Sequence, residues 1–320
     1  MKAIVYRNDG RLEVLRCEEI EKPSAGDDEV LIKVRAAAVN PLDYHLLGHP
    51  FARRLLFART KLKSKRPGRD VAGEVEAVGS LVTEFKPGDA VFGWGGGAFA
   101  EYACTSESAL AKKPEGVTFE QAASAPVAAI TALQGLRDKG KIQPGQKVLI
   151  NGASGGVGTF AVQIAKSSGA DVTGVCSTRN VALVRSIGAD RVIDYTREDF
   201  TENGKRYDLI LDCFATHSLS AIRRVLNLRG RYVGVGGPVG SMIGMLAGQI
   251  TQLVFSSFVS QKFVSFMANL NREDLAVLRG LMQAGKVKPV IDRRYRLSET
   301  PEAIRYLEEG HARGKVVITV

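Results

Sequence analysis

The chain has 320 residues, of which 45% are hydrophobic and 24% are charged. These proportions are typical of folded globular proteins and exclude a disordered, collagen-like or disulfide-stapled chain. The 44 Lys and Arg residues outnumber the 34 Asp and Glu residues and give a formal charge of +10, which favours anionic ligands such as phosphorylated cofactors.

Cysteine spacing and the N-terminal sequence favour an intracellular protein. The cysteines are too far apart to predict a disulfide framework or a thiolate zinc site, so reduced thiols are expected. The N-terminal segment lacks the apolar region of a secretory signal and is interpreted as a first strand. Residues 240–270 are apolar but interrupted by polar residues, which argues against a membrane-spanning helix. A cytoplasmic location is therefore predicted.

The first part of the chain predicts a β-rich domain. Short β-rich runs occur at Val30–Val34, Val71–Val78 and Ala90–Phe92, and turns rich in Gly, Pro and Asp separate them. From about Glu120 the sequence becomes helical and rich in Ala, and strands then alternate with helical stretches. This alternation predicts βαβ units and a parallel sheet.

The second region carries enough strands for a doubly wound sheet, and the length of the chain suits two domains. The expected strands are Lys147–Ile150, Asp171–Val175, Arg191–Ile193, Asp208–Leu211, Arg231–Val235 and Phe263–Phe266. Beyond them we predict amphipathic helices over Arg272–Ala284 and Pro301–Glu309, and a last strand over Lys315–Val320.

The strongest local motif is a glycine-rich turn between a buried strand and an amphipathic helix. This order is the one that a dinucleotide site requires, because small residues let the backbone approach a pyrophosphate at the helix N-terminus. Ala153 stands where the commonest fingerprint has its first glycine, and a plain tight turn without a ligand remains the alternative. The predicted cofactor-binding residues of the turn are Gly152, Ala153, Ser154, Gly155, Gly156, Val157 and Gly158.

The end of the second strand indicates which nucleotide binds. An NAD-preferring site would place Asp or Glu there, about 20 residues beyond the turn, to bind the ribose hydroxyls. This chain instead has Ser177, Thr178 and Arg179, and we expect nothing near them to repel a 2′-phosphate. Two hydroxyls and a guanidinium suit that phosphate, so NADPH is predicted; a solvated Arg179 is the alternative.

These motifs, with PGRDVAGEVEAVGS (residues 67–80), FKPGDAVFG (85–93), GKVKPVIDRRYRLSETPEAI (285–304) and GHARGKVVI (310–318), resemble the medium-chain dehydrogenase/reductase superfamily. The similarity is greatest to its zinc-free quinone oxidoreductase-like branch and covers nearly the whole chain. It implies an α/β fold in which a Rossmann doubly wound parallel sheet is inserted in a GroES-like β-rich catalytic domain, with the cofactor between them. The expected limits are 1–124 and 267–320 for the catalytic domain and 125–266 for the NADP-binding domain.

The resemblance also implies a set of site residues. Where zinc alcohol dehydrogenases of this superfamily carry metal ligands, this chain has Asn40 and Arg69-Asp70, so no metal site is expected. The implied reaction is transfer of hydride from NADPH to a quinone or to the C=C bond of an α,β-unsaturated carbonyl. The residues that the family places along the cofactor are Asn40 and Thr131 near the nicotinamide, Tyr195 near the adenosine phosphate, and Phe214, Val235, Gly236 and Gly237 between them.

Several alternatives remain open from the sequence. Tyr44 is a candidate catalytic proton donor to an enolate, since a phenol can donate a proton, but a packing role is equally consistent. The basic segment Phe51–Arg69 is interpreted as a solvated loop; weak contact with an anionic membrane surface is a second interpretation, and no nucleic-acid partner is predicted. A homodimer is the family expectation. A non-catalytic NADPH sensor or adaptor is the alternative to an enzyme.

Overall fold

The computed structural model describes residues 1–6, 15–48, 66–235 and 259–320. Most of the basic segment, the apolar stretch 242–258 and the predicted cofactor residues Gly236 and Gly237 lie outside the described residues. The chain divides into two compact units, Met1–Ala128 with Leu270–Val320, and Ala129–Asn269. The domain limits expected from the sequence, at 125 and 266, precede these by a few residues.

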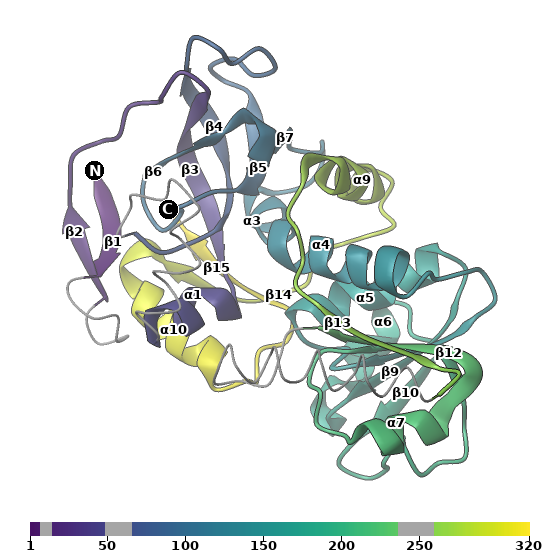
Figure 1. Ribbon diagram of the computed structural model, residues 1–320. Helices are drawn as coiled ribbons and strands as arrows, with labels where there is room; N and C mark the ends of the chain where they lie inside the picture. Colours follow the sequence, from purple (N-terminus) through teal and green to yellow (C-terminus); the bar gives the residue numbers. More distant parts are fainter. Residues whose placement is uncertain (7–14, 49–65, 236–258) are drawn as a thin grey trace. The chain divides into compact units, whose positions relative to one another are not determined.

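The first unit is built on a seven-stranded sheet with the order β14-β15-β3-β4-β5-β7, in which β6 also pairs with β3 (Figure 1). Its pairs are antiparallel except for β14 with β15. The strands are β3 (Glu29–Val39), β4 (Asp70–Val78), β5 (Ala90–Trp94), β6 (Tyr102–Ser106), β7 (Leu110–Lys112), β14 (Ile291–Arg296) and β15 (Lys315–Thr319). A separate two-stranded sheet pairs β1 (Lys2–Tyr6) with β2 (Leu15–Glu19).

The helices of this unit close an apolar core against the sheet. Val30, Ile32 and Val34 of β3 are buried in one hydrophobic core with Val91 of β5 and with Ile304. Side chains at a spacing of two on a strand point to the same face of the sheet. The helices are α1 (Pro41–Gly48), α3 (Phe119–Ala123), α9 (Arg272–Gln283) and α10 (Thr300–Glu308), with 3₁₀ turns at Glu107–Ala109 and Leu297–Glu299. The predicted C-terminal helices and strand are thus confirmed.

The second unit is a six-stranded parallel sheet with the order β10-β9-β8-β11-β12-β13. Its strands are β8 (Lys147–Asn151), β9 (Asp171–Cys176), β10 (Arg191–Asp194), β11 (Tyr207–Asp212), β12 (Leu226–Val235) and β13 (Lys262–Phe266). The order reverses between β8 and β11, and in open α/β sheets ligands bind outside the carboxyl ends of the strands at such a switch point. The predicted doubly wound sheet is confirmed.

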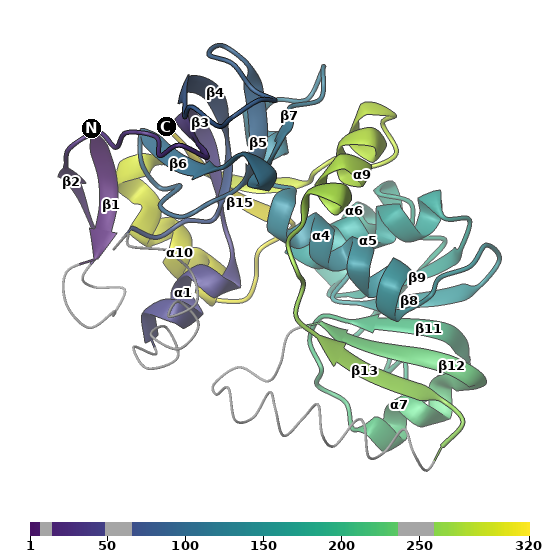
Figure 2. The same ribbon diagram turned by 45° about the horizontal axis from the view of Figure 1, so that its top comes forward.

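Helices cover both faces of this sheet (Figure 2). On one face, Ile222 and Val225 share a core with Leu149 and Ile210. On the other, a Cβ at Gly135 would contact Leu211, so the end of the preceding helix packs there. The helices are α4 (Pro126–Gln134), continued by a π-helical turn at Gly135–Lys139, α5 (Gly156–Ser167), α6 (Val181–Ser186) and α7 (Leu219–Val225), with a 3₁₀ turn at Thr178–Asn180. None of the helices in the described residues is long and apolar enough to cross a membrane.

Candidate functional site

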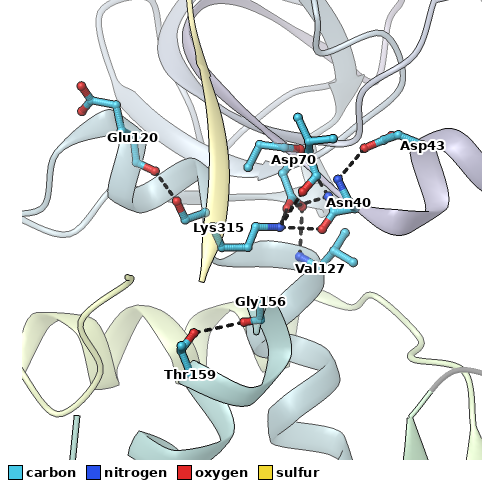
Figure 3. A network of polar contacts seen from close by, with 11 residues as sticks. Asn40, Asp43, Asp70, Glu120, Val127, Gly156, Thr159 and Lys315 are labelled. Carbon is cyan, nitrogen blue, oxygen red and sulfur yellow. Dashed lines mark hydrogen bonds and ion pairs between the residues drawn. The ribbon is translucent and has the colours of Figure 1, made fainter. Parts of the chain in front are cut away.

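Strand register in the first unit brings three distant polar residues together (Figure 3). Strand β15 pairs antiparallel with β3 so that Val316 faces Val39, which puts Lys315 beside Asn40. Strand β4 pairs with the other side of β3 so that Asp70 faces Ala38. The three side chains therefore meet at one end of three neighbouring strands.

Hydrogen bonds join these side chains into one network. The Lys315 Nζ donates to Asn40 Oδ1 at 2.6 Å and to the Val39 carbonyl at 3.2 Å, and lies 3.4 Å from Asp70 Oδ2. The Asn40 Nδ2 donates to Asp70 Oδ2 at 2.9 Å and to the Ala38 carbonyl at 3.3 Å. The second oxygen of Asp70 accepts from the Val127 N–H at 3.0 Å, in the first turn of α4. Each ammonium hydrogen and both amide hydrogens thus have acceptors inside the unit.

Asp43 extends the network from the first turn of α1. Its carboxylate accepts from the Asn40 N–H at 2.8 Å, and the Asn40 carbonyl accepts from the Asp43 N–H, which closes the turn before the helix. Burial raises the pKa of Asp43 to about 7, because the carboxylate loses water and has Asp70 nearby, while the Asn40 N–H, Arg69 and Lys315 oppose the rise. The protonation of this carboxyl group therefore changes near neutral pH.

The network is almost wholly removed from water. Asp70 is 0% exposed, Asn40 2% and Lys315 3%. Burial of this kind raises the pKa of Asp70, and the cation and amide beside it oppose the rise. A buried charge is tolerated only when it is paired and hydrogen-bonded, as Lys315 and Asp70 are here.

This geometry limits what the two predicted catalytic residues can do. Because both N–H bonds of the Asn40 amide are used internally, the side chain can meet an external group only through a remaining lone pair of Oδ1. Tyr44 is half-buried against the core of the same unit, and burial together with Glu308 raises the pKa of its hydroxyl. The phenol therefore stays protonated at neutral pH, so its hydroxyl can donate a hydrogen bond or a proton as well as accept a hydrogen bond.

The glycine-rich turn follows β8, and its glycines at 152, 155 and 158 have different local requirements. Gly152 has a φ of +81°, and a Cβ there would also meet the ring of Phe214 at 2.7 Å. A Cβ on Gly158 would lie 2.0 Å from the Gly152 carbonyl oxygen. At Gly155, by contrast, φ is −83° and the nearest atom to a Cβ would be 3.4 Å away. The surrounding described residues thus require glycine at 152 and 158 but leave the space beside Gly155 open to a ligand.

The start of α5 is suited to an anion. Its N-cap is Gly155, which has no side chain to accept from the first-turn amides, and such amides have no partners within a helix. Residues 154–157 are half-buried, whereas Gly152, Ala153 and Gly158 are buried. The turn therefore offers first-turn backbone N–H groups that have no intrahelical partner, at the positive end of a 12-residue helix.

The buried carboxylate of Asp212 holds the loop that follows β11, next to the switch point of the sheet. Asp212 ends β11 opposite Asn151, the last residue of β8, and accepts from the Asn151 Nδ2 at 2.8 Å and from the Tyr232 hydroxyl at 3.1 Å. It also accepts from the N–H groups of Phe214 and Ala215. These bonds hold the loop after β11, so that Phe214 lies beside the glycine turn with 61% of its surface exposed.

Asn180 links the glycine turn to the end of β9. Its Nδ2 donates to Ser154 Oγ at 3.0 Å and to Ser177 Oγ at 3.2 Å, while the residue is only 5% exposed. Its Oδ1 is buried without a hydrogen-bond partner among the described residues. An orphaned acceptor between two loops that a dinucleotide would touch, with the open space at Gly155, fits a bound nucleotide whose hydroxyl or amino group completes the site.

One expectation about the phosphate pocket is wrong. The sequence suggested that nothing near Ser177, Thr178 and Arg179 would repel a dianion, because no acidic residue is close in the chain. The parallel register sets Asp194, the last residue of β10, beside Cys176, and Thr178 Oγ1 donates to the Asp194 carboxylate at 2.6 Å. The negative charge of Asp194 is therefore in direct contact with Thr178, one of the residues of the proposed phosphate pocket.

The other predicted cofactor residues occupy dispersed positions. Tyr195 is 61% exposed at the end of β10, Thr131 is half-buried in α4, and Val235 ends β12. Their roles remain predictions. Among the residues that the structure describes, no three His, Cys, Asp or Glu side chains are grouped to hold a metal ion.

Sequence reasoning did not single out Lys315, Asp43, Asn180, Asp194 or Asp212 as site residues. A signal was available for two of them, because Lys315 begins an apolar strand and Asp212 ends one, and a charged residue adjoining a buried strand needs a partner. For Asp194 the signal is tertiary, since only the pairing of β9 with β10 sets it beside Thr178.

Comparisons with known proteins establish the family. The model for the alcohol dehydrogenase GroES-like domain matches residues 26–115, and a model described as zinc-binding dehydrogenase matches residues 187–318. The chloroplastic quinone-oxidoreductase QR1 of Triphysaria versicolor is 35% identical over an alignment that covers 99% of this chain and 98% of that protein. The chain belongs to the quinone oxidoreductase-like branch of the medium-chain dehydrogenase/reductase superfamily.

Two further members of the superfamily support this placement. The chloroplastic NADPH-dependent alkenal/one oxidoreductase of Arabidopsis thaliana is 34% identical over 99% of this chain and 79% of that protein. The solved structure of the quinone oxidoreductase from Coxiella burnetii matches with a TM-score of 0.85 and 32% identity, covering 100% of this chain and 99% of that one. The family and fold expected from the sequence are therefore confirmed.

Proposed function

We propose that this medium-chain dehydrogenase/reductase uses NADPH to reduce a quinone or the C=C bond of an α,β-unsaturated carbonyl, and that it does so without zinc. The observation that carries the nucleotide part is the glycine turn, where Gly155 leaves open space and Asn180 presents an orphaned oxygen. Support for the acceptor comes from relatives that are named as a quinone oxidoreductase and an NADPH-dependent alkenal/one oxidoreductase.

The pyrophosphate, the 2′-phosphate and the adenosine of the nucleotide each have a candidate partner in the second unit. The amides at the start of α5 receive the pyrophosphate, because the positive end of a helix favours anions. Ser177 and Arg179 hold the 2′-phosphate, and the exposed rings of Tyr195 and Phe214 contact the adenosine. When bound, NADPH supplies the hydride equivalent, and the protein supplies orientation.

Proton supply is assigned to Tyr44. Its hydroxyl remains protonated because burial and Glu308 raise its pKa, so it can donate to an oxygen that gains negative charge. The substitution Tyr44→Phe keeps the packing surface and removes only the hydroxyl. It should lower turnover with enones while leaving the melting temperature nearly unchanged, whereas a tyrosine that serves only in packing would leave turnover unchanged.

The decisive experiment measures NADPH oxidation by the purified protein against a panel of quinones, enals and enones, with and without a zinc chelator. Turnover that the chelator does not change is expected. Oxidation of simple alcohols that is lost with chelator would refute the proposal, and tight NADPH binding without any turnover would favour the sensor or adaptor instead. Parallel kinetics of Arg179→Ala test the cofactor assignment, because that substitution should impair use of NADPH more than use of NADH.

The cytoplasmic location and the homodimer remain predictions. The relatives from Triphysaria versicolor and Arabidopsis thaliana are both chloroplastic, so the compartment has to be determined directly.

A further inference from the structure

The carboxylate of Asp194 has a defined set of neighbours at the end of β10. Thr178 Oγ1 donates to its Oδ2 at 2.6 Å, and the hydroxyl and N–H of Thr196 donate to its Oδ1 at 2.8 and 3.0 Å. The Arg197 guanidinium lies 3.6 Å away but is 77% exposed, whereas only 14% of the Asp194 side chain is exposed. The anion is thus tied to the loop beside β9 and is only loosely compensated by its cation.

A count of hydrogens shows what this contact does to Thr178. A threonine hydroxyl has one hydrogen, and the bond to Asp194 uses it. The hydroxyl of Thr196 does not replace Thr178 as the donor to Asp194 Oδ2, because its own hydrogen is donated to the other carboxylate oxygen, Oδ1. Thr178 therefore has no hydrogen left for a phosphate. The adjacent Ser177 differs, since its Oγ accepts from Asn180 and keeps its hydrogen available.

The charge of Asp194 persists at neutral pH. The hydroxyls of Thr178 and Thr196, the Thr196 N–H and Arg197 lower its pKa despite some loss of solvation. Its field also reaches Cys176, the β9 residue it faces, where it adds to the effect of burial in raising the thiol pKa. A permanent anion at this position repels a second anion bound to the neighbouring loop.

We propose that Asp194 is a specificity-determining residue that weakens binding of the 2′-phosphate and so narrows this protein's preference for NADPH over NADH. The inference rests on the nucleotide site of the proposed function. It concerns how strongly two forms of one ligand are distinguished, and it does not depend on which acceptor is reduced.

The test is calorimetric titration of the full chain with 2′,5′-ADP, which carries the extra phosphate, and with 5′-ADP, which lacks it. The substitution Asp194→Asn removes the charge and keeps an oxygen that can accept from Thr178. It should tighten 2′,5′-ADP roughly two- to fivefold, as expected of a partly exposed charge, and leave 5′-ADP unchanged. Raising the salt concentration should shrink the gain.

A matched control exists on the same two strands. Asp171 begins β9 and is paired at 2.9 Å with Arg191, which begins β10. Like Asp194 it is an acidic residue with an arginine partner, but it lies at the opposite end of these two strands. Asp171→Asn changes the net charge equally and should alter neither affinity. Asp194→Ala serves as a second variant, because it cannot donate a new hydrogen bond to the phosphate as an asparagine amide can.

The outcomes distinguish a failure of the role of Asp194 from a failure of the nucleotide site. Equal effects of Asp194→Asn on both nucleotides, or weaker binding of 2′,5′-ADP by both Asp194 variants, would overturn the role of Asp194 while leaving the nucleotide site intact. A parent protein that binds neither nucleotide would overturn the nucleotide site itself, and the specificity proposal with it.

Discussion

Lys315 and Asn40 are separated by 275 residues, yet the lysine ammonium donates to the asparagine side-chain oxygen at 2.6 Å inside a buried network. Lys315 also neutralises Asp70, which has no other cation within ion-pair distance among the described residues. The network thus joins the C-terminal strand to the first long strand of the sheet and to the beginning of α4, through the Val127 N–H.

Replacing this lysine should be costly. Lys315→Met leaves the buried carboxylate of Asp70 uncompensated, and breaking a buried pair in this way lowers the free energy of unfolding by about 3–5 kcal/mol. Urea denaturation measures the loss. The double variant Lys315→Met with Asp70→Asn should recover part of it, and a strictly additive double variant would contradict the pairing.

The stability of the protein should also depend on the ionisation of Asp43. Its pKa is raised from 3.8 to about 7 in the folded state, so between these values the folded protein binds more protons than the unfolded chain. The free energy of unfolding from this group therefore falls as pH rises through that window. Asp43→Asn, whose side-chain oxygen can still accept from the Asn40 N–H, should gain up to about 3 kcal/mol relative to the parent between about pH 5 and pH 8. A constant difference across this range would contradict the prediction.

Alanine substitutions at two glycines of the cofactor turn should affect different properties, namely the stability of the fold at Gly158 and NADPH binding at Gly155. Gly158→Ala forces a Cβ to within 2.0 Å of the Gly152 carbonyl oxygen and should destabilise the fold by about 1–3 kcal/mol or more. Gly155→Ala meets no close atom and should leave stability nearly unchanged, but it should weaken NADPH binding about tenfold because its methyl group fills the space for the pyrophosphate. Thermal denaturation and calorimetry on the same two variants measure both effects, and unchanged NADPH affinity in Gly155→Ala would place the phosphates elsewhere.

The cysteines should differ in reactivity. Cys17 is exposed, whereas burial raises the pKa of Cys104 and of Cys176 to about 11 and raises that of Cys213 still further. At about pH 8 only roughly a thousandth of Cys104 or Cys176 is thiolate, so iodoacetamide should modify Cys17 first. Peptide mass spectrometry of a time course checks the order, and early modification of Cys213 would contradict the raised pKa of its thiol.

Features that depend on neighbouring residues in the chain were predictable from the amino-acid sequence. Strand, glycine turn and helix follow one another from Lys147 to Ser167, so their apolar periodicity and their glycines are readable without any long-range contact. Alternation of strands and helices likewise predicted the parallel sheet, because a helical crossover returns the chain to the end of the sheet at which the previous strand began.

Which charged side chains lie next to one another depends instead on how the strands pair in the folded protein. Strand register depends on side-chain packing across the whole sheet, and it is register that places Lys315 against Asn40 and Asp194 against Thr178. The electrostatic character of both sites depends on these pairs, since the interaction of two charges depends on their separation in space and on their removal from water. Separation along the chain carries no information about either quantity.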